Sequence, residues 1–398
     1  MTGNNDNTIY FFYPSTTIGG AELLFFRYYK TLKANNINIK FIVLDNDEIY
    51  FKFNIEKEDI LKVNIFNNNT LNSTIIIPPT TCFNKNYINY FIGCKLIIWS
   101  LHPGLLVGNI KRKFKYLNKI ILKHTYKKII QQNGLWFLDE ACSNPLKTIL
   151  NINFEPLFMP IILDEFTPNK KNSTNKDKLS IAFVGRLENS KIIAVIQILN
   201  KIYESNIFKN NKYVIHIIGD GLAKEKLMDL CKQMEHIIFH GSMENDEMKG
   251  FLCNNVDITF AMGQSLLDSA LAGNLAIKID LHTFALKPED DVNYDFIYDS
   301  INFSLGDIYN KSAKKKYSFE YIEKLIFEKD KLAIEKQKCK QFAIENFTIN
   351  DAGMNKFLKN LDLNQFILDK KNIKMLSNTN FPTFLKNLFY TRKTKQAS

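Results

Sequence analysis

Short apolar runs alternate with longer amphipathic stretches along most of this chain of 398 residues. In parallel α/β proteins, buried strands are apolar runs of about four to eight residues, and the covering helices carry apolar residues every three or four positions. The pattern predicts strands at 9–13, 37–44, 75–77, 95–100, 136–138, 180–184, 213–218, 237–239, 257–261 and 275–279. It predicts helices at 21–34, 223–234 and 264–272, and helical structure from 317 to 346. This alternation predicts an α/β fold with two doubly wound parallel sheets.

The length and one polar segment predict two domains. A chain of this size suits two domains of about 150 to 200 residues each. Residues 167–179 are polar and lack apolar periodicity, which is typical of a linker. We therefore expect an N-terminal Rossmann-like domain at 1–166 and a C-terminal Rossmann-like domain at 180–346. Residues 347–398 are expected to form C-terminal helices and a basic tail that pack back over the surface.

The composition is that of a globular protein. Hydrophobic residues make up 45% and charged residues 23% of the chain, which excludes a disordered protein. The six cysteines lie far apart, with no Cys-x-x-Cys pair, so they are expected to be buried thiols in a reducing compartment. The N-terminus has no signal-peptide pattern, and no stretch approaches the roughly 18 apolar residues of a membrane span. We expect a cytoplasmic protein.

A net charge of +11 predicts an anionic partner. From Lys370 to Ser398 every charged residue is basic, and these residues alternate with aromatic ones such as Phe381, Phe384 and Tyr390. That combination favours a peripheral contact of 370–398 with an anionic membrane surface, on the inner face of the membrane. No nucleic-acid-binding motif accompanies the charge, so a nucleic-acid partner is not expected.

The sharpest local motif follows the first predicted strand of the second half. There Val184, Gly185 and Arg186 are followed by Lys191 at the start of the next helix. Ligands of open α/β sheets bind at such strand ends, and an arginine and a lysine beside a helix N-terminus can hold a diphosphate. The alternative is an ordinary strand-helix turn with two surface cations, which the spacing alone leaves open.

A second motif runs from Met262 to Gly273. Gly263 follows a predicted strand and precedes a helix, whose first N–H groups can bind an anion. Asp268 lies one turn further along, where its carboxylate can accept hydrogen bonds from a ribose diol. By itself it is more typical of a solvated helix acid. The Gly-Asp-Gly at 219–221 is a weaker signal, because such turns are common after strands.

In the first half, Gly19 and Gly20 open the first helix and can present backbone donors to a diphosphate. They do not form a Gly-x-Gly-x-x-Gly fingerprint, which argues against a nicotinamide enzyme. His102 follows another predicted strand. An isolated histidine is more often structural than catalytic.

In this order, these motifs resemble the family-four nucleotide-sugar glycosyltransferases of the GT-B fold, also called glycosyl transferases group 1. The resemblance is strongest from 180 to 279 and weaker over 9–163. It implies two Rossmann-like domains facing across a cleft, with transfer of a sugar from a nucleotide sugar and retention of configuration. It favours a UDP-sugar donor, a glycan or lipid-linked glycan acceptor, and a place in surface polysaccharide or lipopolysaccharide assembly. No metal or other cofactor is expected.

The resemblance also implies roles for individual residues. His102 would be the catalytic-site histidine that meets the donor sugar, and Asp268 would bind the ribose. Gly20, Arg186 and Lys191 would hold the donor diphosphate. The remaining expected contacts, to the nucleobase or the sugar, are Met243, Gly263, Gln264 and Ser265.

Two positions depart from the family pattern, and the smaller change is at Asp268, where an aspartate replaces a glutamate. Eight residues before Asp268, where the family has a glutamate that touches the sugar, this chain has Phe260. Two other functions therefore stay open: a GT-B sugar-nucleotide epimerase, and a non-catalytic relative that binds nucleotide sugar or glycan.

Overall fold

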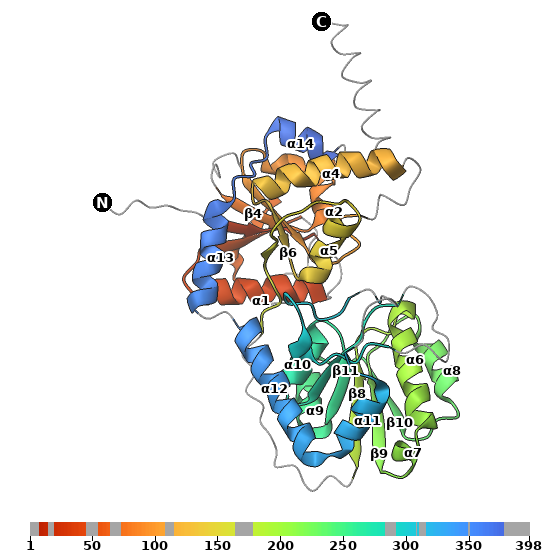
Figure 1. Ribbon diagram of the computed structural model, residues 1–398. Coiled ribbons are helices and arrows are strands. Elements are labelled where there is room, and N and C mark those ends of the chain that lie inside the picture. Colours follow the sequence, from red (N-terminus) through yellow and green to blue (C-terminus); the bar gives the residue numbers. More distant parts are fainter. Residues whose placement is uncertain are drawn as a thin grey trace, which may run out of the picture. The chain divides into compact units, whose positions relative to one another are not determined.

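The computed structural model describes residues 8–14, 20–44, 55–63, 73–107, 115–163, 178–282, 292–307, 309, 316–348 and 351–377. The chain divides into two compact units (Figure 1). The first unit comprises Met1–Ile162 and Ile349–Ser398, and the second comprises Leu163–Thr348. The divisions fall at Ile162 rather than at residue 166, and at Thr348 rather than at residue 346. Most of the expected linker lies outside the described residues, and its last residue, Leu179, already belongs to a strand.

The first unit contains a seven-stranded sheet in the order β3-β2-β1-β4-β5-β6-β7, and all of its neighbouring strands pair in parallel. Its strands are β1 (Ile9–Phe11), β2 (Ile39–Val43), β3 (Ile60–Lys62), β4 (Thr74–Ile77), β5 (Lys95–Ser100), β6 (Leu135–Phe137) and β7 (Leu157–Phe158). The strands predicted from the sequence are present within a few residues. The short strands β3 and β7 lie at the two edges of the sheet, and their apolar runs were too short to detect.

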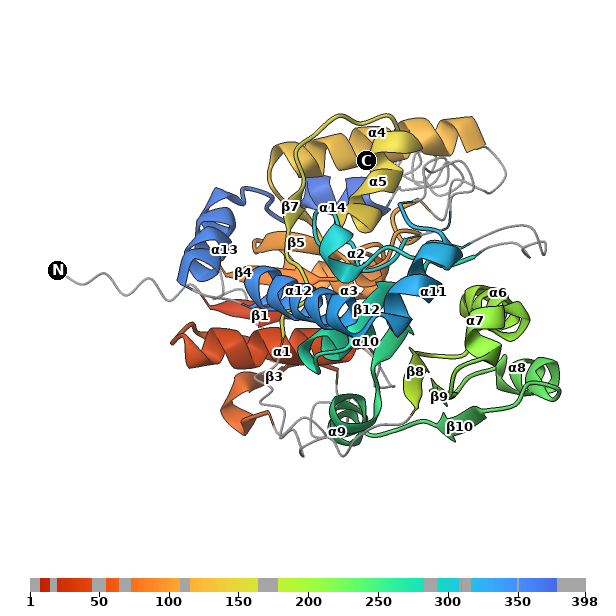
Figure 2. The same cartoon turned by 60° about the horizontal axis from the view of Figure 1, so that its bottom comes forward.

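Helices cover both faces of this sheet because successive strand residues point to opposite sides. The helical segments are α1 (Gly20–Ala34), η2 (Lys57–Asp59), α2 (Pro79–Cys82), α3 (Lys85–Ile88), η5 (Asn89–Phe91), α4 (Lys115–Gln131), α5 (Glu140–Thr148), α13 (Asp351–Leu363) and α14 (Lys370–Ser377). On one face, Tyr28 of α1 contacts both Trp99 of β5 and Phe357 of α13. On the other, Leu96 and Ile98 of β5 join a core with residues of α3, α4 and α14. Figures 1 and 2 both show α1 on one side of the sheet and α4 with α14 on the other.

The second unit contains a five-stranded parallel sheet in the order β10-β9-β8-β11-β12. Its strands are β8 (Leu179–Val184), β9 (Tyr213–Ile218), β10 (Ile237–Gly241), β11 (Ile258–Ala261) and β12 (Leu275–Lys278). The chain runs outward from β8 through β9 and β10, then returns to β11 on the other side of β8. The loops after β8 and β11 therefore diverge, which is where open α/β sheets bind ligands.

The helical segments of the second unit are α6 (Asn189–Glu204), α7 (Asn206–Lys209), α8 (Lys224–Cys231), α9 (Asn245–Asn255), α10 (Gln264–Leu271), η7 (Ile297–Asp299), α11 (Phe319–Phe327) and α12 (Lys329–Phe347). Helix α6 packs with α7 and α8, whereas α10 packs with α9 and α12. The predicted doubly wound α/β architecture is thus confirmed for both sheets.

The structure also bears on two expectations drawn from composition. All six cysteines are free; five are buried, as expected, but Cys253 is only partly buried. Among the described residues, no helix combines the length and apolar character needed to cross a membrane.

Candidate functional site

The loops that follow β8, β9 and β10 are joined backbone to backbone at the edge where these parallel strands end, here called the carboxyl edge. The amide of Gly185 donates to the carbonyl of Ile218 at 3.0 Å, and the amide of Gly219 donates to the carbonyl of Gly241 at 2.7 Å. The amide of Leu187 donates to the carbonyl of Asp220 at 2.9 Å. The carboxyl edge is therefore a pre-organised frame.

Two glycines make this close approach possible. Gly219 has φ +138°, and a Cβ there would lie 2.0 Å from the carbonyl oxygen of Gly185. A Cβ on Gly221 would lie 2.5 Å from the carbonyl oxygen of Leu187. A Cβ on Gly185 would meet no atom within 4 Å, so its backbone is open to an approaching ligand. The Gly-Asp-Gly motif, weak in the sequence, thus shapes the loop that carries Arg186.

Arg186 and Lys191 flank the entry to α6. The Arg186 side chain is 63% exposed, and one of its guanidinium nitrogens lies 3.3 Å from a Glu188 carboxylate oxygen. Burial lowers the pKa of Lys191, the Glu188 charge opposes this shift, and the Arg186 charge adds to it. A partly desolvated ammonium beside a second cation is stabilised by a bound anion. The two side chains can therefore bind a diphosphate, which would compete with Glu188 for Arg186.

The turn after β11 opens helix α10. Gly263 is its N-cap, with φ 61° and ψ −134°, a conformation that favours glycine. Its amide donates to the carbonyl of Leu305 at 2.8 Å. Gln264 and Ser265, both half-buried, form the first turn of α10, where backbone N–H groups point out of the helix. Asp268 lies one turn further and is only 2% exposed.

Met243 is half-buried and lies between β10 and α9, at the same carboxyl edge. Just before it, Nε2 of His240 lies 2.9 Å from Nδ1 of His216, and both rings contact Phe251. Burial lowers the pKa of His240, which favours a neutral imidazole pair. No sequence pattern indicates this pair, because its members lie on different strands.

Phe260, which stands eight residues before Asp268, points into the core of the second unit. It lies inside β11, is 3% exposed, and stacks on Phe183 of β8 with ring centroids 5.0 Å apart. It is therefore a core residue, and the residue that follows β11 at the carboxyl edge is Met262, next to Gly263.

In the first unit, Gly20 and His102 follow strands β1 and β5, which are separated by β4 and end at one edge of the sheet. Gly20 is exposed and begins α1, whereas residues 15–19 lie outside the described residues. Nδ1 of the exposed His102 accepts a hydrogen bond from the Gly104 amide at 3.1 Å. The proton of the neutral ring is then on Nε2, which makes that nitrogen a donor.

Glu22, in the first turn of α1, faces Tyr13 after β1. Burial, together with this carboxylate, raises the pKa of Tyr13 to about 12. The Gly-Gly-Ala-Glu sequence at 19–22, which resembles the family motif, therefore ends in a glutamate whose carboxylate faces Tyr13 of the same unit.

The described residues contain no group of three histidine, cysteine, aspartate or glutamate side chains arranged to hold a metal ion. Arg186 and Lys191 contribute cationic groups at the carboxyl edge, and the first turn of α10 contributes backbone donors. This combination suits an anionic ligand.

At the level of sequence, the chain has a partial match to a known protein. No protein-family model matches the chain. A segment of 95 residues is 28% identical to an uncharacterized 41.2 kDa protein in the cps region of Klebsiella pneumoniae; it covers 23% of this chain and 24% of that protein.

Two solved structures resemble the whole fold. One is a mutant of S. aureus TarM in complex with fondaparinux, α-GlcNAc-glycerol and UDP, with TM-score 0.59 and 11% identity, covering 89% of this chain and 100% of that one. The other is WaaG, a glycosyltransferase involved in lipopolysaccharide biosynthesis, with TM-score 0.52 and 12% identity, covering 90% and 99%. The chain thus has the fold of the GT-B glycosyltransferases.

Proposed function

We propose that this protein is a glycosyltransferase that moves a sugar from a nucleotide-sugar donor, preferably a UDP-sugar, to a glycan or lipid-linked glycan acceptor. The observation that carries the proposal is that two cationic side chains, Arg186 and the partly desolvated Lys191, lie beside the open backbone of Gly185. They do so at the topological switch point of a GT-B sheet. UDP in the TarM structure supports a uridine donor.

The relatives support a biological setting for this proposal. WaaG is involved in lipopolysaccharide biosynthesis, and the Klebsiella relative lies in a cps region. We therefore propose a role in surface polysaccharide or lipopolysaccharide assembly.

In the proposed mechanism, the chain stabilises the departing nucleoside diphosphate rather than forming a covalent bond to the sugar. Negative charge grows on the β-phosphate as the glycosidic bond breaks, and Arg186, Lys191 and the N-terminus of α10 stabilise that charge. Asp268 accepts hydrogen bonds from the ribose hydroxyls, and Met243 contacts the nucleobase. We further propose the Gly20 backbone as a contact of the donor diphosphate.

We propose that transfer proceeds with retention of configuration. The leaving phosphate oxygen would take the proton of the acceptor hydroxyl on the same face of the sugar. His102 donates from Nε2 to a sugar hydroxyl and orients the ring, while Gly263, Gln264 and Ser265 contact the same sugar. Sugar hydrolases, in contrast, place two carboxylates on either side of the bond.

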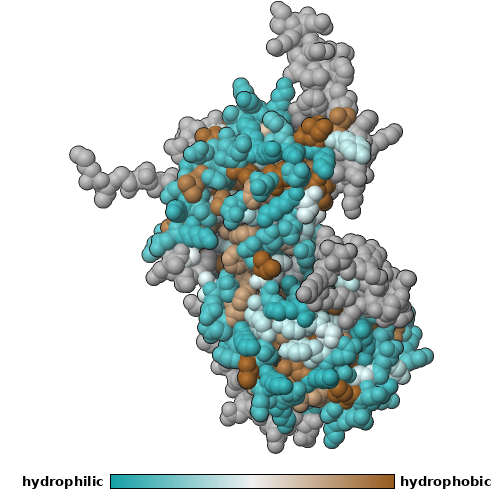
Figure 3. All heavy atoms as spheres, in the orientation of Figure 1, coloured by the Kyte–Doolittle hydropathy of each residue, from teal (hydrophilic) through white to brown (hydrophobic). Residues whose placement is uncertain are grey.

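We also propose that the first unit docks on an anionic membrane from the cytoplasmic side, which brings a lipid-linked acceptor to the enzyme. Helix α4 has five lysines and no acidic residue, and its Tyr116 and Ile120 are 82% and 64% exposed. It lies beside α14, where Lys128 donates to Asn372, and α14 exposes Lys370, Lys371 and Lys374. Figure 3 shows hydrophobic residues exposed at the upper edge of the unit, near α4. The tail at 378–398 lies outside the described residues.

The first experiment is calorimetric titration with UDP, GDP and UDP-sugars, using wild type, Arg186→Ala, Asp268→Ala and the control Lys232→Ala on the far end of α8. Micromolar binding of one nucleotide that only the first two substitutions weaken supports the donor site. Absence of binding to every nucleotide contradicts it.

Product analysis separates the enzymatic alternatives. Glycoside formed only when an acceptor is present supports transfer, whereas an epimerised or hydrolysed sugar nucleotide without acceptor indicates an epimerase. Nucleotide-sugar binding without any turnover indicates a non-catalytic relative.

A further inference from the structure

A buried carboxylate lies just past β12. Asp280 is 4% exposed, and its two oxygens accept hydrogen bonds from different segments. Oδ1 accepts from the Asp307 amide at 3.0 Å, and Oδ2 accepts from Nδ2 of Asn293 at 2.5 Å. Burial raises the pKa of Asp280, while these two hydrogen bonds and the charge of Lys278 oppose the shift. A buried charge is costly, so its hydrogen bonds hold both partner segments in place.

The segment 305–307 in turn holds the Gly263 turn. The carbonyl of Leu305 accepts the Gly263 amide at 2.8 Å. Gly306 has φ +141°, and a Cβ there would lie 2.7 Å from the Met262 side chain and 3.2 Å from the Ile279 carbonyl oxygen. Residues 305–307 therefore pack closely between β12 and the start of α10.

The residues that follow β12 also contact the segment that carries Lys191. The amide of His282 donates to the carbonyl of Ser190 at 2.9 Å, directly before Lys191. The His282 ring stacks on Tyr309 with centroids 4.2 Å apart, and the Tyr309 amide donates to the carbonyl of Leu281 at 2.8 Å. Residues 280–282 thus contact both the α6 side and, through 305–307, the α10 side of the carboxyl edge.

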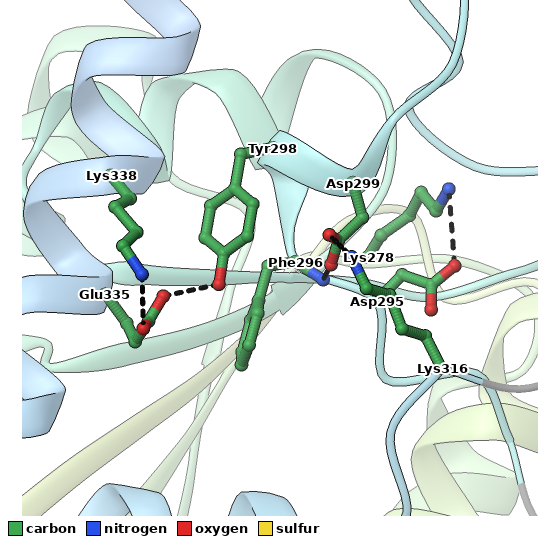
Figure 4. A network of polar contacts seen from close by, with 8 residues as sticks. All are labelled: Lys278, Asp295, Phe296, Tyr298, Asp299, Lys316, Glu335 and Lys338. Atoms are coloured by element: carbon green, nitrogen blue, oxygen red, sulfur yellow. Dashed lines mark hydrogen bonds and ion pairs between the residues drawn. The ribbon is translucent and has the colours of Figure 1, made fainter.

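The segment that carries Asn293 is held by a polar network, and Figure 4 shows the part of this network around Asp295 and Asp299. The Lys278 amide donates to the Asp295 carbonyl at 2.8 Å, and Ile277 and Phe296 form an antiparallel bridge. Asp299 accepts from the Phe296 amide at 3.0 Å and from Lys316. The segment 292–299 is therefore tied to β12, so that Asn293 is a fixed donor to Asp280.

We propose that Asp280 is the positioning residue of the donor site: it holds the Gly263 turn in the geometry that recognises the transferred sugar. The proposal rests on the proposed function. Loss of the carboxylate removes the acceptor of the Asp307 amide and so loosens residues 305–307 and the Gly263 amide, while the backbone bonds from Leu281 to Asp307 and from His282 to Ser190 remain. Recognition of the sugar therefore depends on Asp280 more strongly than recognition of the nucleoside diphosphate, which Arg186 and Lys191 also bind.

The test uses Asp280→Asn. The new side chain keeps one acceptor oxygen, and its NH2 group faces a second donor, either Nδ2 of Asn293 or the Asp307 amide. The double substitution Asp280→Asn with Asn293→Asp reverses the pair and restores both hydrogen bonds. Asp295→Asn is the matched control, because it removes a neighbouring carboxylate that bonds to neither Asn293 nor the Asp307 amide. If Asp280→Asn does not fold, Asn293→Ser is used instead, because it removes only the hydrogen bond from Asn293 to Asp280.

Two readouts are measured on the full chain: hydrogen exchange of the peptide that contains Gly263, and calorimetric affinity for UDP and for the UDP-sugar that the wild type binds. We expect Asp280→Asn to speed exchange at Gly263 and to weaken UDP-sugar binding about tenfold, with UDP binding changed less than about threefold. The double variant restores wild-type values, and the control leaves them unchanged.

Unchanged exchange at Gly263, equal weakening of UDP and UDP-sugar, or failure of the double variant to restore them would each overturn the proposal. If the wild type binds no nucleotide, the proposed function fails. The exchange measurement still decides whether Asp280 holds the Gly263 turn.

Discussion

The α-carbon of Gly219 faces the carbonyl oxygen of Gly185 so closely that a Cβ would lie 2.0 Å from it. This approach is what allows the loops after β8 and β9 to hydrogen-bond along their backbones. The glycine is therefore needed for the frame that carries Arg186, even though it has no side chain with which to bind a ligand.

Gly219→Ala is expected to destabilise the second unit by about 1–3 kcal/mol, because the loop must shift and the backbone has φ +138°. Gly250→Ala is the control: it lies within α9 with no atom near its Cβ, and is expected to stabilise by about 0.5–1 kcal/mol. Both tryptophans lie in the first unit, so far-UV circular dichroism during urea unfolding is the suitable measurement. Equal stability of the two variants would contradict the packing argument.

Lys191→Met is expected to abolish UDP binding while raising the melting temperature of the ligand-free protein. Burial lowers the pKa of Lys191 in the folded state, so between that value and about 10.5 the unfolded state binds more protons. Wild-type stability therefore gains from Lys191 as the pH rises through this window, and the variant lacks that gain. Thermal unfolding between pH 7 and 10.5 checks the sign; an unchanged pH profile in the variant would refute it.

His102→Ala is expected to lower kcat by about 10²-fold with little effect on UDP affinity, because its Nε2–H is proposed to act on the sugar. His102→Gln, which keeps a donor, should retain more activity than the alanine variant. Steady-state kinetics with a soluble acceptor and calorimetry with UDP separate the two effects. His124→Ala, exposed on α4, is the control. Loss of UDP binding in His102→Ala would assign the histidine to the nucleotide instead.

Tyr116→Asp combined with Ile120→Asp is expected to weaken binding to anionic vesicles at least about tenfold, because it removes two exposed apolar anchors and adds negative charge. Ile334→Asp, on exposed α12 of the second unit, should bind vesicles like the wild type. Sedimentation with phosphatidylglycerol vesicles measures both. If the α4 variant still binds and a chain truncated after Ser377 does not, the tail at 378–398 carries the contact.

Phe260→Glu creates the residue that the family spacing calls for, yet it is expected to destabilise the second unit by about 3–5 kcal/mol. The reason is that Phe260 is buried against Phe183. Phe260→Leu should cost only about 1 kcal/mol. Urea unfolding followed by circular dichroism compares them. A stable Phe260→Glu variant with higher activity would show that the position does reach the sugar.

Much of this protein was determined by its sequence alone. The alternation of apolar runs predicted both parallel sheets, because burial on two faces leaves a local pattern that needs no tertiary information. The motifs at Gly185–Arg186–Lys191 and Gly263 were found for the same reason: each is a short segment in which a strand ends and a helix begins.

Tertiary structure decided what depends on residues far apart in the chain. The edge strands β3 and β7 are too short to leave a pattern, and the contact of Gly219 with Gly185 joins loops 34 positions apart. Phe260 stands, by its spacing from Asp268, where the family has a glutamate, and only strand pairing shows that its side chain lies in the core. Asp280 meets Asn293 and Asp307 through folding alone, since a hydrogen bond between distant segments requires no spacing that a sequence pattern can reveal.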